Sequence, residues 1–302
     1  METIKKIDMH VHCCLEKGPE RLRGETWPTV DELRSIYDLY GIEKGVEMAR
    51  LAPERSHDPI TNRDAEKLAR QFPGTIGWWF CYMDPRMGTN SPGDDLSYYL
   101  DYYKDHGARG VGEIQAGIDL DDPRYMNLFH HIEKSGLPVT IHFGVQGEGC
   151  GPWDDAGLPR LRRVLEEFPK LTVLGHAAPF WAEISGDVDP AKRNSYVDGP
   201  VTEGNIAKML RKYPNLYCDL SAGSGYNALS RDLDYTYKFF REFHERLVYA
   251  TDIRQPSDRD GKLIRTGALI DEAYQNGVID ETQYINIVRR NALRLLSGES
   301  RL

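Results

Sequence analysis

Short apolar runs alternate with longer amphipathic segments along the chain. The runs are rich in β-branched and aromatic residues, which is typical of buried strands, whereas the segments between them repeat apolar positions with helical spacing. Eight runs have the character of strands: residues 4–11, 45–51, 75–82, 108–114, 137–143, 171–176, 215–220 and 246–251. Helical spacing occurs over residues 30–40, 61–72, 95–106, 122–135, 157–168, 201–213, 229–244, 263–276 and 281–297.

This alternation predicts parallel βαβ units. Pro73, Pro169 and Pro214 each stand just past a helical segment, where a helix is expected to stop. Eight units in 302 residues predict an α/β fold of the closed (β/α)8 TIM-barrel type. At this length we expect one domain, residues 1–302, with additional helices at the C-terminus. An open doubly wound sheet would need a glycine-rich turn after the first strand, where this chain has histidines and cysteines.

A barrel places its functional groups at the C-terminal ends of the strands. The first strand ends in Asp8-Met9-His10-Val11-His12. His10 and His12 are two residues apart, so they point to the same face and suit two ligands of one metal ion. Asp8 has the same parity and is a candidate to accept a ring N–H from beneath the pair. The run alone fits two packed histidines equally well.

Later strands also end in polar residues: Glu113, His142, His176 and Asp252. Four of the nine histidines therefore stand at predicted strand ends. The others fall in loops or helical segments, where solvated or locally bonded histidines are ordinary. His57 stays a candidate because it lies on the loop after the second strand.

Charge and composition exclude several classes of partner. Lys and Arg total 38 against 47 Asp and Glu, and there is no basic block, so we expect no nucleic-acid partner. No apolar stretch approaches the roughly 20 residues that cross a bilayer, so we expect no membrane partner. The start lacks the apolar core of a signal peptide, and five scattered cysteines fit free thiols. We therefore expect a cytoplasmic protein.

Five motifs follow one another at the strand ends: DMHVH, IHFG around His142, LGHAAPFW around His176, YPNLYCDLSA and LVYATDI. A terminal segment, NALRLL, follows them. Together they resemble the amidohydrolase superfamily, and in particular the branch that contains aminocarboxymuconate-semialdehyde decarboxylase. The resemblance extends over essentially the whole chain.

The resemblance implies that His10, His12 and His142 bind one divalent metal ion, with Asp252 as a further ligand. It also implies that His176 is catalytic without contacting the metal. Imidazole with one carboxylate favours Zn²⁺ with one position left open for water. Asp252 is a candidate base toward that water, and His176 a candidate proton donor or stabiliser of developing charge.

The fourth predicted strand departs from one pattern of the superfamily. Many members carry a lysine there that bridges two metals, but residues 109–114 contain none, so we expect a single ion. Glu113 either supplies a carboxylate to a second ion or supports the site, and we favour support because a buried glutamate is normally paired. Asp219 is expected to orient a neighbouring group.

Substrate contacts are less clearly indicated. Arg254 and Arg50 are candidate carboxylate binders, because guanidinium engages carboxylate bidentately. Trp181 is a candidate for an aromatic wall. The stretches 144–157 and 186–199 exceed the usual length of a connection after a strand and are candidates for loops that enclose a small-molecule substrate.

Two enzymatic hypotheses follow. The first is a metal-dependent hydrolase that opens a lactone, ester or amide with metal-activated water. The second is a nonoxidative decarboxylase of a carboxylated aromatic or muconate-like acid. The candidate ligands do not separate them, and we place the hydrolase slightly ahead. A noncatalytic zinc scaffold is disfavoured because structural zinc sites are closed and usually rich in cysteine. The resemblance also implies a homodimer.

Overall fold

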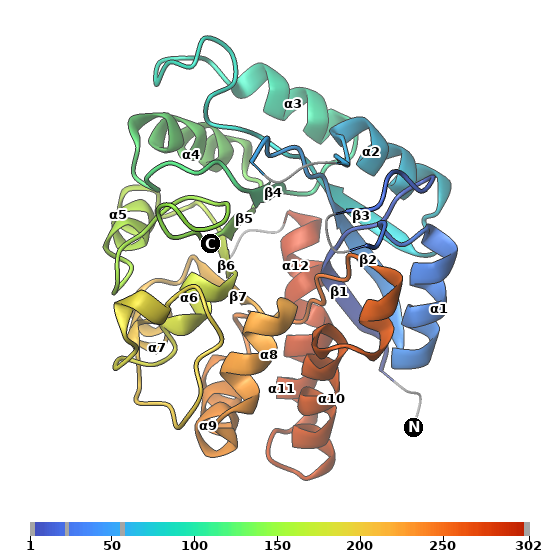
Figure 1. Ribbon diagram of the computed structural model, residues 1–302, viewed down its shortest axis with the longest axis vertical. Helices are drawn as coiled ribbons and strands as arrows, with labels where there is room; N and C mark the ends of the chain where they lie inside the picture. Colours follow the sequence, from blue (N-terminus) through green and yellow to red (C-terminus); the bar gives the residue numbers. More distant parts are fainter. Residues whose placement is uncertain (1–3, 22–23, 55–57, 299–302) are drawn as a thin grey trace.

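The computed structural model describes residues 4–21, 24–54 and 58–298. Eight parallel strands lie at the centre and helices surround them (Figure 1). The strands are β1 (Lys6–Val11), β2 (Ile42–Met48), β3 (Ile76–Phe80), β4 (Val111–Ile114), β5 (Val139–His142), β6 (Val173–His176), β7 (Leu216–Asp219) and β8 (Leu247–Val248). Each falls within or overlaps a predicted run, so the strand pattern is confirmed.

The helices follow the strands in the predicted order. They are α1 (Val30–Tyr40), α2 (Asn62–Gln71), α3 (Ser97–Asp105), α4 (Pro123–Ser135), α5 (Pro159–Glu167), α6 (Ala178–Ala182), α7 (Asn205–Lys212), α8 (Ala222–Ser230), α9 (Leu233–Phe243), α10 (Lys262–Gln275), α11 (Glu281–Ile285) and α12 (Asn291–Ser297). Short turns of other helix types are η1 (Pro190–Lys192), η2 (Pro256–Asp260) and the π-helical η3 (Asn286–Arg290). The short helices α6 and α8, which follow β6 and β7, were not predicted.

Capping residues explain where the first helices begin. Thr29 accepts a hydrogen bond from Glu32 N at 3.3 Å, and the Glu32 side chain accepts one from Thr29 N at 2.9 Å. Thr61 and Asp64 form the same reciprocal pair at the start of α2. These capping boxes satisfy backbone donors that the first turn leaves free. In the described part of the chain, no helix combines the length and apolar character needed to cross a membrane.

The strands pair in order as β1 to β3 and as β4 to β8. Backbone hydrogen bonds join the two groups at both seams. Cys81 N, just after β3, donates to Gly110 O at 2.9 Å, and His12 N donates to Ile253 O, beyond β8, at 2.9 Å. These bonds link the two groups of strands at both seams, as the predicted (β/α)8 barrel requires.

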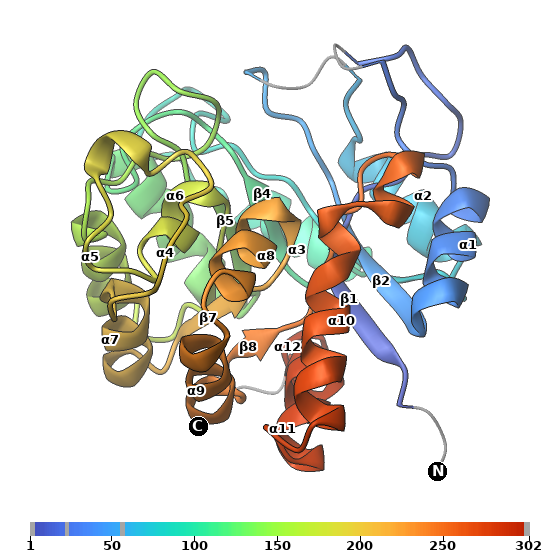
Figure 2. The same cartoon turned by 60° about the horizontal axis from the view of Figure 1, so that its bottom comes forward.

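Two apolar cores stabilise this arrangement. The larger lies between the strands and the surrounding helices. The smaller draws on strand residues and on α12, which places it inside the barrel. Ala292 and Leu296 of α12 pack there against the strands, and Figure 2 shows α12 beside β1 and β8. The barrel is therefore filled by side chains and covered at its N-terminal end by α12.

Two strands carry one extra residue near their C-terminal ends. In β1 the register advances three residues from Asp8 to Val11 while β2 advances two. In β4 it advances three from Val111 to Ile114 while β5 advances two. An extra residue of this kind interrupts the alternation of side chains and re-aims those next to it. Both irregularities fall where the sequence places its candidate functional residues.

Candidate functional site

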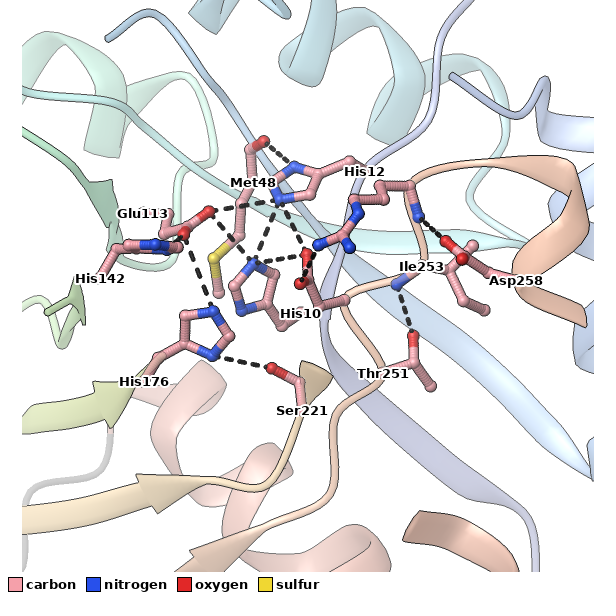
Figure 3. Close-up of polar contacts among 12 residues, drawn as sticks. His10, His12, Met48, Glu113, His142, His176, Ser221, Thr251, Ile253 and Asp258 are labelled. Carbon is pink, nitrogen blue, oxygen red and sulfur yellow. Dashed lines mark hydrogen bonds and ion pairs between the residues drawn. The ribbon is translucent and has the colours of Figure 1, made fainter. Parts of the chain in front are cut away.

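Six polar side chains that the sequence singles out come together at the C-terminal end of the barrel, and Figure 3 shows the histidines and Glu113 among them. They are His10 of β1, His12 just after β1, Glu113 of β4, His142 at the end of β5, His176 at the end of β6 and Asp252 after β8. Five are buried, and His142 is partly exposed. Separate strands thus deliver one polar cluster to the barrel mouth, which is the C-terminal end of the barrel.

His10 in β1 and His12 just after it present the same ring nitrogen, Nε2, to each other. His12 Nδ1 donates to the carbonyl oxygen of Met48 at 3.0 Å, because a carbonyl can only accept. His10 Nδ1 lies 2.7 Å from Asp219 Oδ2. These contacts leave the two Nε2 atoms facing one another at 3.2 Å. Both rings are held in the orientation that a shared ligand would need.

The charges around the pair decide where a proton resides. Burial opposes the charge of His10, but the carboxylates of Asp219 and Glu113 raise its pKa well above the ordinary value. Burial lowers the pKa of His12, and the charges of His10 and Arg50 act in the same direction. In the chain alone, His10 therefore carries the proton and His12 Nε2 accepts it. A divalent cation bound between the rings would take the place of that proton.

Two carboxylates face the same space. Asp252 Oδ1 lies 3.8 Å from His10 Nε2 and 3.5 Å from His12 Nε2. Glu113 Oε2 lies 3.5 Å and 3.4 Å from the same two atoms. This Glu113 oxygen is buried and faces the two rings at ion-pair distance, but it has no hydrogen bond among the described residues and so can still accept a ligand. Two imidazoles and two carboxylates form a donor set that fits a divalent metal ion.

A second group lies on the other side of Glu113. His142 Nδ1 contacts Glu113 Oε1, and His176 Nε2 lies 3.8 Å from the same oxygen. Ligand atoms of these three residues also lie close enough together to hold an ion. The predicted ligand His142 is thus joined to the His10 and His12 pair through Glu113. The sequence favours a supporting role for Glu113. In the structure its carboxylate lies between the two groups of histidines and faces both.

His176 is held by the end of β7. Its Nδ1 lies 3.0 Å from Ser221 Oγ, and Ser221 N donates to Asp219 Oδ1 at 2.9 Å. Burial lowers the pKa of His176 to about 4, so the ring is neutral at pH 7. Asp219, which was expected to orient a neighbour, therefore orients both His10 and Ser221. The strand-end rule that identified Asp219 also applies to Ser221, which the sequence analysis missed.

Asp252 is positioned by its own chain and by an arginine. Its backbone N donates to His10 O at 2.8 Å, and its φ of 57° lies in the left-handed region, where non-glycine residues are uncommon. Arg254 Nη1 lies 3.1 Å from Asp252 Oδ2. Burial favours the protonated carboxyl, but Arg254 and the neighbouring histidines hold the pKa of Asp252 below its ordinary value. Asp252 is therefore a charged carboxylate at neutral pH.

Asp8 supports the main chain of His10 and not its ring. Asp8 Oδ1 accepts from His10 N at 3.1 Å, and Oδ2 accepts from the hydroxyls of Tyr37 and Thr251 at 2.9 Å and 2.6 Å. Tyr37 belongs to α1, so Asp8 faces the helix layer. The extra residue in β1 explains this, because it breaks the parity that the sequence analysis assumed.

Trp181, a candidate for an aromatic wall facing the substrate, is instead buried. It is 1% exposed, and its Nε1 donates to Asp219 O at 3.1 Å. It therefore supports β7 instead of forming an open wall for a ligand. Within the stretch 144–157, Cys150 contacts the ring of His142, so this loop does reach the cluster. His57 lies outside the described residues.

Three arginines gather at the rim beside His12. The Cζ atoms of Arg21 and Arg50 lie 4.1 Å and 5.6 Å from the centre of the Trp27 ring, which is 5.6 Å from the His12 ring. Burial lowers the pKa of Arg21, and the charges of Arg254 and Arg50 lower it further. We call Arg21, Arg50 and Arg254 the rim arginines. Their mutual repulsion means that an anion between them would be stabilised.

Known structures of this fold share its architecture at low sequence identity. A probable 2-pyrone-4,6-dicarboxylic acid hydrolase from Acinetobacter baumannii matches with a TM-score of 0.58 and 12% identity, covering 97% of this chain and 100% of its own. 5-Carboxyvanillate decarboxylase from Sphingomonas paucimobilis matches with a TM-score of 0.61 and 14% identity, over 98% and 99%. A dihydroxybenzoic acid decarboxylase from Polaromonas sp. JS666, with bound manganese, matches with a TM-score of 0.53 and 14% identity, over 98% and 97%.

At these identities the likeness establishes the fold and leaves the reaction open. A search of curated proteins gives no match. The family model described as amidohydrolase matches residues 7–297, which is nearly the whole chain. Its span includes every residue of the polar cluster, and the fold is the one that the neighbouring structures share. The chain therefore belongs to the amidohydrolase family.

Proposed function

We propose that this protein is a metal-dependent hydrolase that opens a lactone, ester or amide bond in a small molecule. The observation that carries the proposal is the convergence of His10 Nε2, His12 Nε2, Asp252 Oδ1 and Glu113 Oε2 on one space. This set would hold the ion, and His142 would complete it or steady Glu113. Nitrogen and carboxylate donors support zinc as the first metal to test.

When bound, a divalent ion would polarise the substrate carbonyl and bring the pKa of a water molecule toward about 7. Asp252 is charged and would accept the proton of the attacking water. His176 is neutral, so it would donate a hydrogen bond to the oxygen that gains charge and would not act as an imidazolium. Asp219 would keep His10 and Ser221 in place through its two oxygens.

The rim arginines support a substrate that carries a carboxylate. Arg50 and Arg21 flank Trp27 next to His12, and Arg254 lies beside Asp252. A carboxylate bound there would relieve the repulsion between the guanidinium groups and would place the rest of the molecule toward the metal ligands. The first substrates to test are therefore lactones, esters and amides that contain a free carboxylate.

The test is a screen of zinc-loaded and manganese-loaded protein against such compounds. Acid release from lactones and esters is followed by a pH indicator, and amine release from amides by an amine-reactive dye. His176→Ala is expected to lower turnover by about 10²- to 10³-fold, the usual contribution of a hydrogen-bond donor to the oxygen that gains charge. His106→Ala is the matched control, since His106 is exposed at the end of α3. A folded, metal-replete His176→Ala protein with undiminished turnover would contradict the assignment of His176.

A second candidate function is nonoxidative decarboxylation of a carboxylated aromatic or muconate-like acid. The rim arginines favour it, because a decarboxylase needs an anchor for carboxylate groups close to the reacting carbon. Here carbon dioxide would leave and the substrate carbon would take up one proton. His176 is neutral in the chain alone, so it would first have to receive a proton from the incoming acid before it could deliver one. Measuring carbon dioxide separately from acid release in the same screen distinguishes the two reactions.

A further inference from the structure

Gln115, just after β4, has a buried side-chain amide that makes no hydrogen bond to any described residue. The residue is 0% exposed, and neither Nε2 nor Oε1 has a hydrogen-bond partner among the residues that the structure describes. Buried polar groups are nearly always paired, and an unpaired amide destabilises the folded protein. An amide retained in this state therefore requires an explanation outside the stability of the chain.

The neighbours of Gln115 show which way it faces. Ile114 and Ala116 both belong to the core between the strands and the helices. Because side chains alternate along an extended chain, Gln115 is placed on the opposite side of the chain from Ile114 and Ala116, which is the side of Glu113. Glu113, two residues earlier, already reaches His10 and His12. Gln115 thus stands one step beyond Glu113 in the direction of the entrance.

The backbone of Gln115 also joins the candidate site to a long loop. Gly151 N donates to Gln115 O at 2.8 Å, and the adjacent Cys150 contacts the ring of His142. The residue is therefore held between β4 and the stretch 144–157, which was predicted to enclose a substrate. A backbone hydrogen bond therefore holds Gln115 in place, while its side-chain amide forms no hydrogen bond among the described residues.

We propose that Gln115 is a substrate-positioning residue whose amide binds a hydroxyl group of the substrate. The amide offers one acceptor and an N–H donor, and a hydroxyl can satisfy both at once. A carboxylate would leave Oε1 unpaired and would be repelled by Glu113, whereas an ammonium group would leave Nε2 unpaired. This inference rests on the proposed function for its setting, and it adds a hydroxyl to the carboxylate that the rim arginines would hold.

The test measures binding, so it does not depend on turnover. The probes are isophthalate and its 2-, 4- and 5-hydroxy derivatives, titrated calorimetrically into zinc-loaded protein. We expect the best hydroxy isomer to bind about tenfold more tightly than isophthalate, since the unsubstituted ligand leaves the amide unpaired. In Gln115→Met, which keeps the length of the side chain, the two affinities should agree within about twofold. Gln71→Met, at an exposed position in α2, should keep the tenfold preference.

Thermal stability provides the second readout. Removing an unpaired buried amide should raise the Tm of Gln115→Met by about 2–4 °C, the shift that a modest stabilisation produces in a chain of this size. A Tm that falls would overturn the inference, because Gln115 would then be structural. So would a hydroxyl preference that persists in Gln115→Met, no preference in the native protein, or no binding of any probe. A lost preference in a protein without hydrolase activity would uphold the inference and reject the proposed function.

Discussion

The two ends of the barrel bury different kinds of side chain, ionisable groups at the mouth and mainly apolar groups at the end that α12 covers. At the mouth, charged and polar side chains such as Glu113 and Gln115 are buried with atoms that lack hydrogen-bond partners among the described residues. At the other end, Ala292 and Leu296 of α12 pack against apolar residues such as Ile7 and Val248. The comparison indicates a division of labour in which the N-terminal end supplies stability and the mouth gives up some stability for chemistry.

The largest effect is expected from His12→Ala at the mouth. Removing one of the two facing imidazoles should lower metal content well below one ion per chain and reduce turnover by about a thousandfold or more, equivalent to about 4 kcal/mol. Circular dichroism should show a folded protein, because the apolar end is untouched. His130→Ala, at an exposed position in α4, is the control. If His12→Ala kept its metal and its turnover, the mouth would not be the end of the barrel that carries the chemistry.

Leu296→Ala tests the opposite end. Leu296 is 2% exposed and packs inside the barrel, so its truncation should lower the free energy of unfolding by about 2–5 kcal/mol. The folded fraction should keep its kcat/KM within about twofold. Urea denaturation and steady-state kinetics on the same preparation check both parts. If Leu296→Ala were stable but impaired in turnover, the N-terminal end would contribute to catalysis and not mainly to stability.

Asp219→Asn should have a smaller effect at the mouth. Asp219 accepts from the ring of His10, and loss of its charge should weaken metal affinity by about 10- to 100-fold, as is usual for a residue that orients a ligand. Competition with a chromophoric chelator measures this directly. Asp234→Asn, at an exposed position in α9, should leave metal affinity unchanged. Equal affinities for the two variants would mean that His10 needs no such support.

The residues at the strand ends were predictable because strands show a local alternation of apolar and polar positions. In a barrel, functional groups lie where those strands end. His10, His142, His176 and Asp252 were all found in this way. Asp8 was assigned to the ring of His10 because parity was counted through β1, and no sequence signal revealed the extra residue there. The carbonyl of Met48 could not be anticipated either, since any residue supplies one.

The sequence also could not predict how the candidate metal ligands are arranged around one another. Glu113 lies between two groups because β4 carries an extra residue and because β1, β5 and β6 close around it. Gln115 was not singled out, since a lone glutamine after a strand has no distinguishing pattern. These features depend on tertiary packing, which a single sequence does not display.

The smallest predicted effect is a pH dependence in the loop above the mouth. Burial raises the pKa of Asp154 to about 6, whereas an unfolded chain has a value near 4. The folded protein therefore holds this proton more tightly, so the contribution of Asp154 to stability is complete below about pH 4 and is lost as the pH rises through about 6.

Asp154→Asn removes this titration and keeps an oxygen that can accept from the backbone at the start of α5. The Tm of the native protein relative to the variant should therefore be higher at pH 5 than at pH 7.5, by about 2–4 °C. Differential scanning calorimetry at the two pH values measures the difference. A gap that is constant, or that widens with pH, would show that burial of this carboxyl has no such consequence.

The central claim is that His10, His12, Asp252 and Glu113 hold one metal ion. Anomalous diffraction at the zinc edge, from crystals grown with one equivalent of zinc, tests it most directly. The account predicts a single peak about 2.0–2.1 Å from His10 Nε2 and from His12 Nε2, with a carboxylate oxygen of Asp252 or Glu113 in its coordination shell. The absence of a peak between the two rings, or a peak at other residues only, would contradict it.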